Sequence, residues 1–128
     1  EKMRKITKHI IHCSDSPDNR KVTVADIDSW HKERGWKGIG YHYVIYRDGS
    51  LHNGRNEAEV GAHCEGHNSE SIGTCLIGRD TFTQEQFKAL KQLHSMLKIK
   101  YLGLESFGHR DFNSGKTCPN FEVKEVLC

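Results

Sequence analysis

One amphipathic stretch constrains the fold more than any other feature of this chain. Apolar and aromatic side chains recur there at helical spacing, at Phe87, Leu90, Leu93, His94, Leu97 and Tyr101. Residues three and four positions apart lie on the same face of a helix. Thr83 and Gln86 have the spacing of a reciprocal N-terminal cap. We therefore predict a helix from Gln84 to Lys100 that packs one face on a sheet.

A second helix is predicted from Val24 to Arg34. Thr23 is its N-cap, and Asp26 stands three positions later, as a capping box requires. Gly35 ends this helix. One face of it would carry Ile27, Trp30 and His31.

Short β-forming segments alternate with these helices, at residues 10–12, 41–47, 71–77 and 104–107. Asp48-Gly49 predicts a hairpin turn into residues 50–52, and Tyr41, Tyr43 and Ile45 are expected to share one face. Strands alternating with two long helices indicate an α/β or α+β fold, with a central mixed sheet flanked by helices. At 128 residues, the chain is expected to form one domain, residues 1–128.

Charge and hydropathy exclude several classes of partner. With 19 basic and 17 acidic residues, the net charge is only +2, too little for the basic surface of a nucleic-acid-binding protein. No apolar run approaches the roughly 18 residues of a membrane-spanning helix. The first residues lack the apolar core of a signal peptide, so synthesis in the cytoplasm without a signal is expected.

Three potential metal ligands are divided between the two ends of the chain. His12 ends an apolar strand, His109 follows the last predicted strand directly, and Cys118 comes nine residues later. Two imidazoles and one thiolate make three zinc ligands and leave the fourth position open, as in catalytic zinc sites. The alternative is that these residues are ordinary core or surface side chains, since the chain has nine histidines.

The five cysteines are an odd number and include no C-x-x-C pair, so they indicate neither a zinc ribbon nor a complete disulfide framework. If Cys118 binds metal, four cysteines remain. We expect these four to be reduced thiols: Cys13, Cys64, Cys75 and Cys128.

Several short motifs occur in an order that is typical of one family. They are Ile11-His12-Cys13-Ser14, Trp30-His31-Lys32-Glu33, Gly40-Tyr41-His42-Tyr43, Arg47-Asp48-Gly49, Gly61-Ala62-His63, Ser71-Ile72-Gly73, Gly108-His109-Arg110-Asp111 and Lys116-Thr117-Cys118-Pro119. In this order the chain resembles the zinc-dependent N-acetylmuramoyl-L-alanine amidases of type 2. That class includes the peptidoglycan recognition proteins and the amidase-type lysozymes of tailed phages. The resemblance extends from about Lys8 to Phe121.

The resemblance implies a zinc hydrolase that cleaves the amide between N-acetylmuramic acid and L-alanine in bacterial peptidoglycan. It places the Zn²⁺ ligands at His12, His109 and Cys118. Tyr41 would hold or deprotonate the attacking water, and Lys116 would stabilise the charge on the carbonyl oxygen. Without the resemblance, Tyr41 would be interpreted as a core aromatic residue and Lys116 as a solvated charge.

The resemblance also places His63 in a loop at one wall of the cleft, where it either binds substrate or fixes the loop by hydrogen bonds. Trp36 either lines the cleft or fills the core. Five histidines are predicted to be structural or surface residues: His31, His42, His52, His67 and His94.

Two other functions are compatible with this family. One is a peptidoglycan-binding receptor without catalysis, in which the cysteine ligand is typically replaced; here it is present. The other is a regulatory role, because some phage lysozymes of this type also bind the RNA polymerase of their phage. We expect a monomer that acts on the cell wall or in the periplasm.

Overall fold

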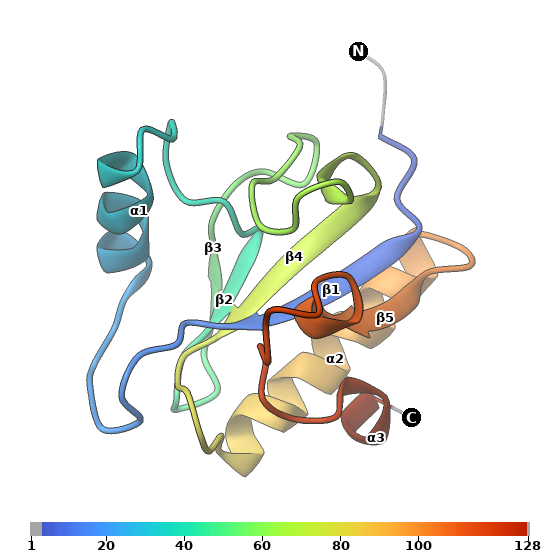
Figure 1. Ribbon diagram of the computed structural model, residues 1–128. Helices are drawn as coiled ribbons and strands as arrows, with labels where there is room; N and C mark the ends of the chain where they lie inside the picture. The colour runs from blue at the N-terminus through green and yellow to red at the C-terminus, as the bar shows by residue number, and fades with distance from the viewer. Residues whose placement is uncertain (1–3, 128) are drawn as a thin grey trace.

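The computed structural model describes residues 4–127 as a mixed five-stranded sheet with helices around it (Figure 1). The strands are β1 (Lys8–Cys13), β2 (Tyr43–Ile45), β3 (Leu51–Asn53), β4 (Ser71–Leu76) and β5 (Glu105–Gly108). The helices are α1 (Val24–Glu33), α2 (Gln84–Lys100) and the short α3 (Val123–Leu127). This arrangement confirms the predicted central mixed sheet flanked by helices.

Both predicted helix starts are confirmed by their caps. The Thr83 hydroxyl accepts a hydrogen bond from the backbone N–H of Gln86, whose side-chain oxygen accepts one from the N–H of Thr83. Thr23 and Asp26 make the same reciprocal pair at the start of α1. Each capping box satisfies two donors that the first turn of a helix leaves free. Local sequence therefore sets where both helices begin.

Strand order brings the two ends of the chain together. The order is β3-β2-β4-β1-β5, with β1 parallel to both β4 and β5. β2 is parallel to β4, and β3 returns antiparallel to β2 as the predicted hairpin. Parallel strands have their carboxyl ends at one edge of the sheet. His12 near the end of β1 and His109 directly after β5 therefore become neighbours.

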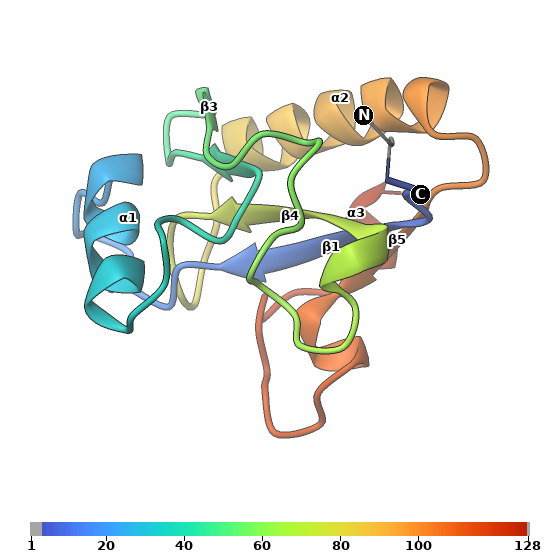
Figure 2. The ribbon, with the colours of Figure 1, turned by 90° about the horizontal axis from the view of Figure 1, so that it is seen from above.

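The two faces of the sheet have different roles. Figure 2 shows α2 along one face, while the connection after β5 lies on the other side. Ile11 and Leu76 pack with Leu90 of α2 in one core cluster. Because side chains alternate along a strand, His12 points to the face opposite Ile11. That opposite face carries the cleft described below.

The prediction that Tyr41 shares a face with Tyr43 and Ile45 is wrong. The strand begins at Tyr43 rather than Tyr41. Tyr41 packs against the cluster around Ile27, whereas Tyr43 and Ile45 pack on the α2 side. The chain before β2 is bonded to segments outside the ladder, for example through the Gly40 carbonyl, which accepts from the N–H of Ala62. The strand alternation therefore does not extend back to Tyr41.

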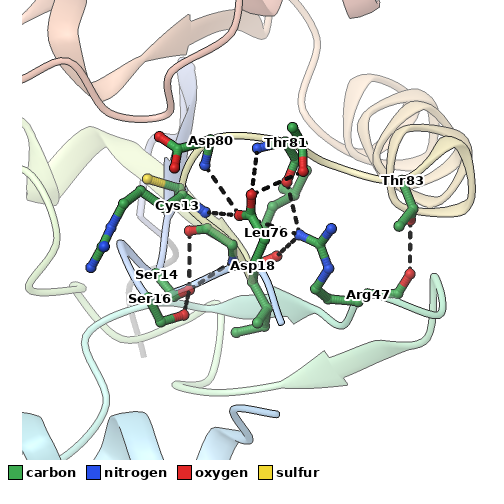
Figure 3. A network of polar contacts seen from close by, with 12 residues as sticks. Cys13, Ser14, Ser16, Asp18, Arg47, Leu76, Asp80, Thr81 and Thr83 are labelled. Carbon is green, nitrogen blue, oxygen red and sulfur yellow. Dashed lines mark hydrogen bonds and ion pairs between the residues drawn. The ribbon is translucent and has the colours of Figure 1, made fainter. Parts of the chain in front are cut away.

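A polar network anchors the chain where it leaves β1 (Figure 3). The carboxylate of Asp18 accepts hydrogen bonds from the backbone N–H groups of Arg79, Asp80 and Thr81. These bonds, the one from Arg79 first, lower the pKa of Asp18 to about 2. The backbone N–H of Ser14 donates to the carbonyl of Leu76 at 3.0 Å. The segment after His12 and Cys13 is thereby tied to the connection between β4 and α2.

Within residues 4–127, no helix is both long and apolar enough to span a bilayer. In the same part of the chain Cys13, Cys64 and Cys75 are buried cysteines that form no disulfide. Cys128 lies outside the described residues.

Candidate metal centre

His12, His109 and Cys118 converge at the carboxyl edge of the sheet. One ligand atom from each lies within 4.8 Å of the others. The ring centroids of His12 and His109 are 4.5 Å apart. His12 is buried, whereas His109 and Cys118 are half-buried and face a cleft. The structure thus brings together the three residues that the sequence singles out as metal ligands.

Local hydrogen bonds place the two candidate ligands that follow β5. The carboxylate of Asp111 accepts from the backbone N–H of Gly108 at 2.8 Å, which shapes the turn that begins with His109. The N–H of Arg110 donates to the Cys118 carbonyl at 2.9 Å and closes the intervening loop. These bonds bring His109 and Cys118, which are nine residues apart in the sequence, close together.

The two imidazoles are held in the neutral state that a metal requires. Burial lowers the pKa of His12 well below its usual value, and the neighbouring His63 and His109 rings lower it further. Burial and then the positive charge of Lys116 lower the pKa of His109. Neutral imidazole offers a lone pair, so neither histidine has to lose a proton before binding a metal at neutral pH.

Cys118 completes the donor set. The hydrogen bond with the Cys13 thiol and then burial raise the pKa of the Cys118 thiol. The free cysteine is therefore a thiol at neutral pH, and a metal must displace its proton. Two imidazoles and one sulfur suit Zn²⁺ and leave a coordination position toward the cleft. The residues present fit a zinc ion.

The three candidate ligands lie in a cleft of about 770 Å³. All six candidate site residues line this cleft: His12, His109, Cys118, Tyr41, His63 and Lys116. Trp36 lines it as well. Trp36 is 38% exposed, so it belongs to the cleft wall and does not fill the core.

Tyr41 packs beside the candidate ligand His12. Its ring centroid lies 5.1 Å from that of His12 and 5.5 Å from that of His31. Burial raises the pKa of Tyr41 well above its usual value near 10, and the thiols of Cys75 and Cys118 add to the effect. Tyr41 is therefore a neutral phenol, which can donate and accept hydrogen bonds.

Three of the other histidines have structural contacts, as predicted. His31 Nδ1 accepts from the backbone N–H of Gly40 at 2.9 Å, and His42 Nδ1 accepts from that of Gly73 at 3.0 Å. His94 lies on the buried face of α2, with its Nδ1 2.9 Å from that of His9.

Sequence reasoning missed two contacts around the ligands. The backbone N–H of Cys13 donates to Cys118 Sγ, and Ser71 Oγ lies 3.2 Å from His63 Nε2. No local signal predicts either contact: the first joins residues 105 positions apart, and the second depends on how the loop before β4 folds back. The glycines at 61 and 73 are the one sequence hint, since both make room for His63.

The family model described as N-acetylmuramoyl-L-alanine amidase matches residues 2–121. The chain belongs to this amidase family. The endolysin of Klebsiella phage KP32 is 38% identical to it over 96% of this chain and 86% of the relative. The predicted family is thereby confirmed, and the matching region includes every residue of the candidate metal centre.

Solved structures extend the comparison to the fold of this amidase. The N-acetylmuramoyl-L-alanine amidase LysC from Clostridium intestinale matches with a TM-score of 0.88 and 32% identity, over 96% of this chain and 83% of LysC. A mutant of Drosophila PGRP-LB in complex with tracheal cytotoxin matches with a TM-score of 0.79 and 28% identity, over 93% of this chain and 76% of PGRP-LB. The expected type-2 amidase fold is confirmed.

Proposed function

We propose that this protein is a single-domain zinc amidase of the bacterial cell wall. It hydrolyses the amide between N-acetylmuramic acid and L-alanine in peptidoglycan. Membership of the amidase family and the likeness to phage endolysins support this reaction. The observation that carries the proposal is the convergence of His12, His109 and Cys118 in one cleft.

The proposed ligands would hold the ion through two imidazole nitrogens and the Cys118 sulfur. A zinc ion in such a site lowers the pKa of a water toward 7 and polarises a carbonyl group. Cys118 is oriented before any metal arrives, because the backbone N–H of Cys13 donates to its sulfur at 3.0 Å. Its loop is also tied to Arg110. The protein thus supplies a pre-shaped site.

Tyr41 is proposed to position the attacking water. Its raised pKa argues against a phenolate that removes a proton, because such a base would need the charged form at neutral pH. A neutral phenol instead fixes the water by a hydrogen bond. Of the two roles that the family resemblance allows Tyr41, the raised pKa supports the one that holds the water.

Lys116 is proposed to stabilise the transition state. It is exposed on the cleft wall, close enough to His109 to lower that residue's pKa. Negative charge develops on the amide carbonyl oxygen during attack by water, and an ammonium there stabilises it. Water adds across the C–N bond, leaving a carboxylate on the lactyl group and an amine on L-alanine.

The test uses purified peptidoglycan and measures newly freed L-alanine amino termini. Release is expected from the wild type, to be lost with a chelator and to return with added zinc. Cys118→Ser should abolish release, whereas Cys64→Ser is the matched control, because Cys64 is a buried thiol outside the donor set. Cys64→Ser should keep most of the activity.

A folded, zinc-loaded wild type that binds peptidoglycan without releasing amino termini would contradict the hydrolase. It would indicate a peptidoglycan-binding receptor on the same fold. Retained activity in Cys118→Ser would instead contradict the proposed ligand set.

A further inference from the structure

His63 contacts His12 from the loop that connects β3 to β4. Nδ1 of His63 is 2.9 Å from Nε2 of His12, and Nε2 of His63 is 3.2 Å from Ser71 Oγ. The two rings are perpendicular, with an interplanar angle of 89° and centroids 4.9 Å apart. An unbroken row of hydrogen-bonding groups therefore runs from Ser71 through His63 to His12.

The surrounding chain is built to hold this ring. A Cβ at Gly73 would lie 2.6 Å from His63 ring atoms, and one at Gly61 would lie 2.7 Å from its Cδ2. Any side chain at either position would displace the ring. The side-chain oxygen of Asn68 accepts a hydrogen bond from the backbone N–H of His63 at 2.9 Å, which fixes the loop. His63 is 8% exposed, so little of it is available to a ligand.

The row of hydrogen bonds has only one proton arrangement that leaves His12 ready for a metal. A metal requires the lone pair of the His12 nitrogen that it binds. Nε2 of His12 is taken up by His63, so Nδ1 is the nitrogen left for the metal. His12 must then carry its proton on Nε2 and donate it to His63 Nδ1. His63 in turn carries its proton on Nε2 and donates to Ser71 Oγ.

The reverse arrangement would block the site. With the proton on His63 Nδ1, His12 Nε2 would be the acceptor and Nδ1 of a neutral His12 would carry the proton. The Ser71 hydroxyl can accept a hydrogen bond from His63 Nε2, so it gives that N–H a partner in the productive arrangement.

We propose that His63 is a positioning residue for the metal centre. It holds His12 in the tautomer and orientation that expose Nδ1 to the metal, and Ser71 supplies a hydrogen-bond partner for His63 Nε2. This inference rests on the proposed zinc site. It assigns His63 a role in supporting the ligand in place of direct substrate binding. Removing such a partner of a ligating histidine typically lowers metal affinity about 10- to 100-fold.

The test measures zinc affinity by competition with a chromophoric chelator, without substrate. His63→Phe should bind zinc about 10- to 100-fold more weakly than the wild type. His63→Asn should stay within about threefold, because its side-chain oxygen can replace the Nδ1 acceptor. Ser71→Ala should show a smaller loss than His63→Phe. His52→Phe is the matched control, because His52 lies on β3 outside the cleft.

A second measurement reports the tautomer directly. ¹⁵N chemical shifts of the metal-free wild type should show His12 protonated at Nε2 and bare at Nδ1. In His63→Phe the two tautomers should become mixed. If His63→Phe does not fold, His63→Asn, Ser71→Ala and the wild-type spectrum decide the question.

Unchanged zinc affinity in folded His63→Phe, with a raised KM for peptidoglycan, would overturn the inference and assign His63 to substrate binding. A wild-type His12 protonated at Nδ1 would also overturn it. A wild type that binds no zinc at all would instead overturn the proposed metal centre, on which the inference rests.

Discussion

The backbone N–H of Cys13 donates a hydrogen bond to Sγ of Cys118 at 3.0 Å, across 105 positions of sequence. A backbone donor aimed at sulfur stabilises the thiolate form that a metal requires. The same bond attaches the loop of Cys118 to β1, which carries His12. Two of the three proposed ligands are therefore held in place by the fold before a metal binds.

Zinc should stabilise the folded protein. A ligand that binds only the folded state adds about 2.7 kcal/mol at a free concentration of 100 times its Kd. We expect zinc to raise the melting temperature of the chelator-treated wild type in a thermal scan. Cys118→Ser should show little increase and Cys64→Ser the full increase. Equal increases in all three proteins would argue against Cys118 as a ligand.

Tyr41→Phe should lower kcat by about 100-fold, because it removes one hydrogen bond to the reacting water while the ring keeps its packing. Zinc affinity should be unchanged, since Tyr41 is not in the donor set. Steady-state release of amino termini measures the first quantity, and chelator competition the second. A loss of zinc affinity equal to the loss of activity would show that Tyr41 supports the metal site instead.

Lys116→Met should lower kcat more than it changes KM, because the ammonium acts on charge that develops only during attack. We expect a loss of about 10- to 100-fold. The control is Lys91→Met, which removes an exposed charge from α2, outside the cleft. A higher KM with unchanged kcat would place Lys116 in ground-state binding.

Acid should destabilise the metal-free protein from about pH 6.5 downward. Nδ1 of His9 on β1 and Nδ1 of His94 on α2 lie 2.9 Å apart, and burial lowers the pKa of both. The unfolded chain therefore takes up protons first as pH falls. The free energy of unfolding is highest above about pH 6.5. It decreases below that pH by up to about 1.4 kcal/mol per pH unit for each histidine.

Urea unfolding at pH 7.5 and 5.5 measures this loss. His94→Gln is the comparison, because it keeps a polar partner for His9 without a titrating ring. Its loss between the two pH values should be smaller than that of the wild type. Identical losses in the two proteins would mean that His94 does not contribute.

Gly73→Ala should destabilise the protein by about 1–3 kcal/mol, because the added methyl group collides with the His63 ring. Gly73→Ala should therefore cost less free energy of unfolding in a His63→Ala background than in the wild type. A double-mutant cycle in urea measures this difference. If the effects of the two substitutions on the free energy of unfolding were strictly additive, the His63 ring would not be what the added methyl group displaces.

The helices and the hairpin could be predicted from the sequence because their signals are local. The capping pairs at Thr23 and Thr83, and the Asp48-Gly49 turn, involve residues within a few positions of one another. The same holds for His12, which ends an apolar run before turn-forming residues. The candidate ligands were proposed from residue chemistry and from the order of the family motifs, and the family match itself is confirmed.

Only the tertiary structure decided how these pieces meet. The central place of β1 between β4 and β5 makes His12 and His109 neighbours, and strand order depends on packing between distant segments. The face of Tyr41 was mispredicted because strand alternation holds only where the ladder is regular, and the strand begins only at Tyr43. The contact between His63 and His12 spans 51 positions, and the room for it comes from Gly61 and Gly73. The sequence by itself thus determined the chemical groups and the local elements, whereas long-range packing decided which of those groups touch.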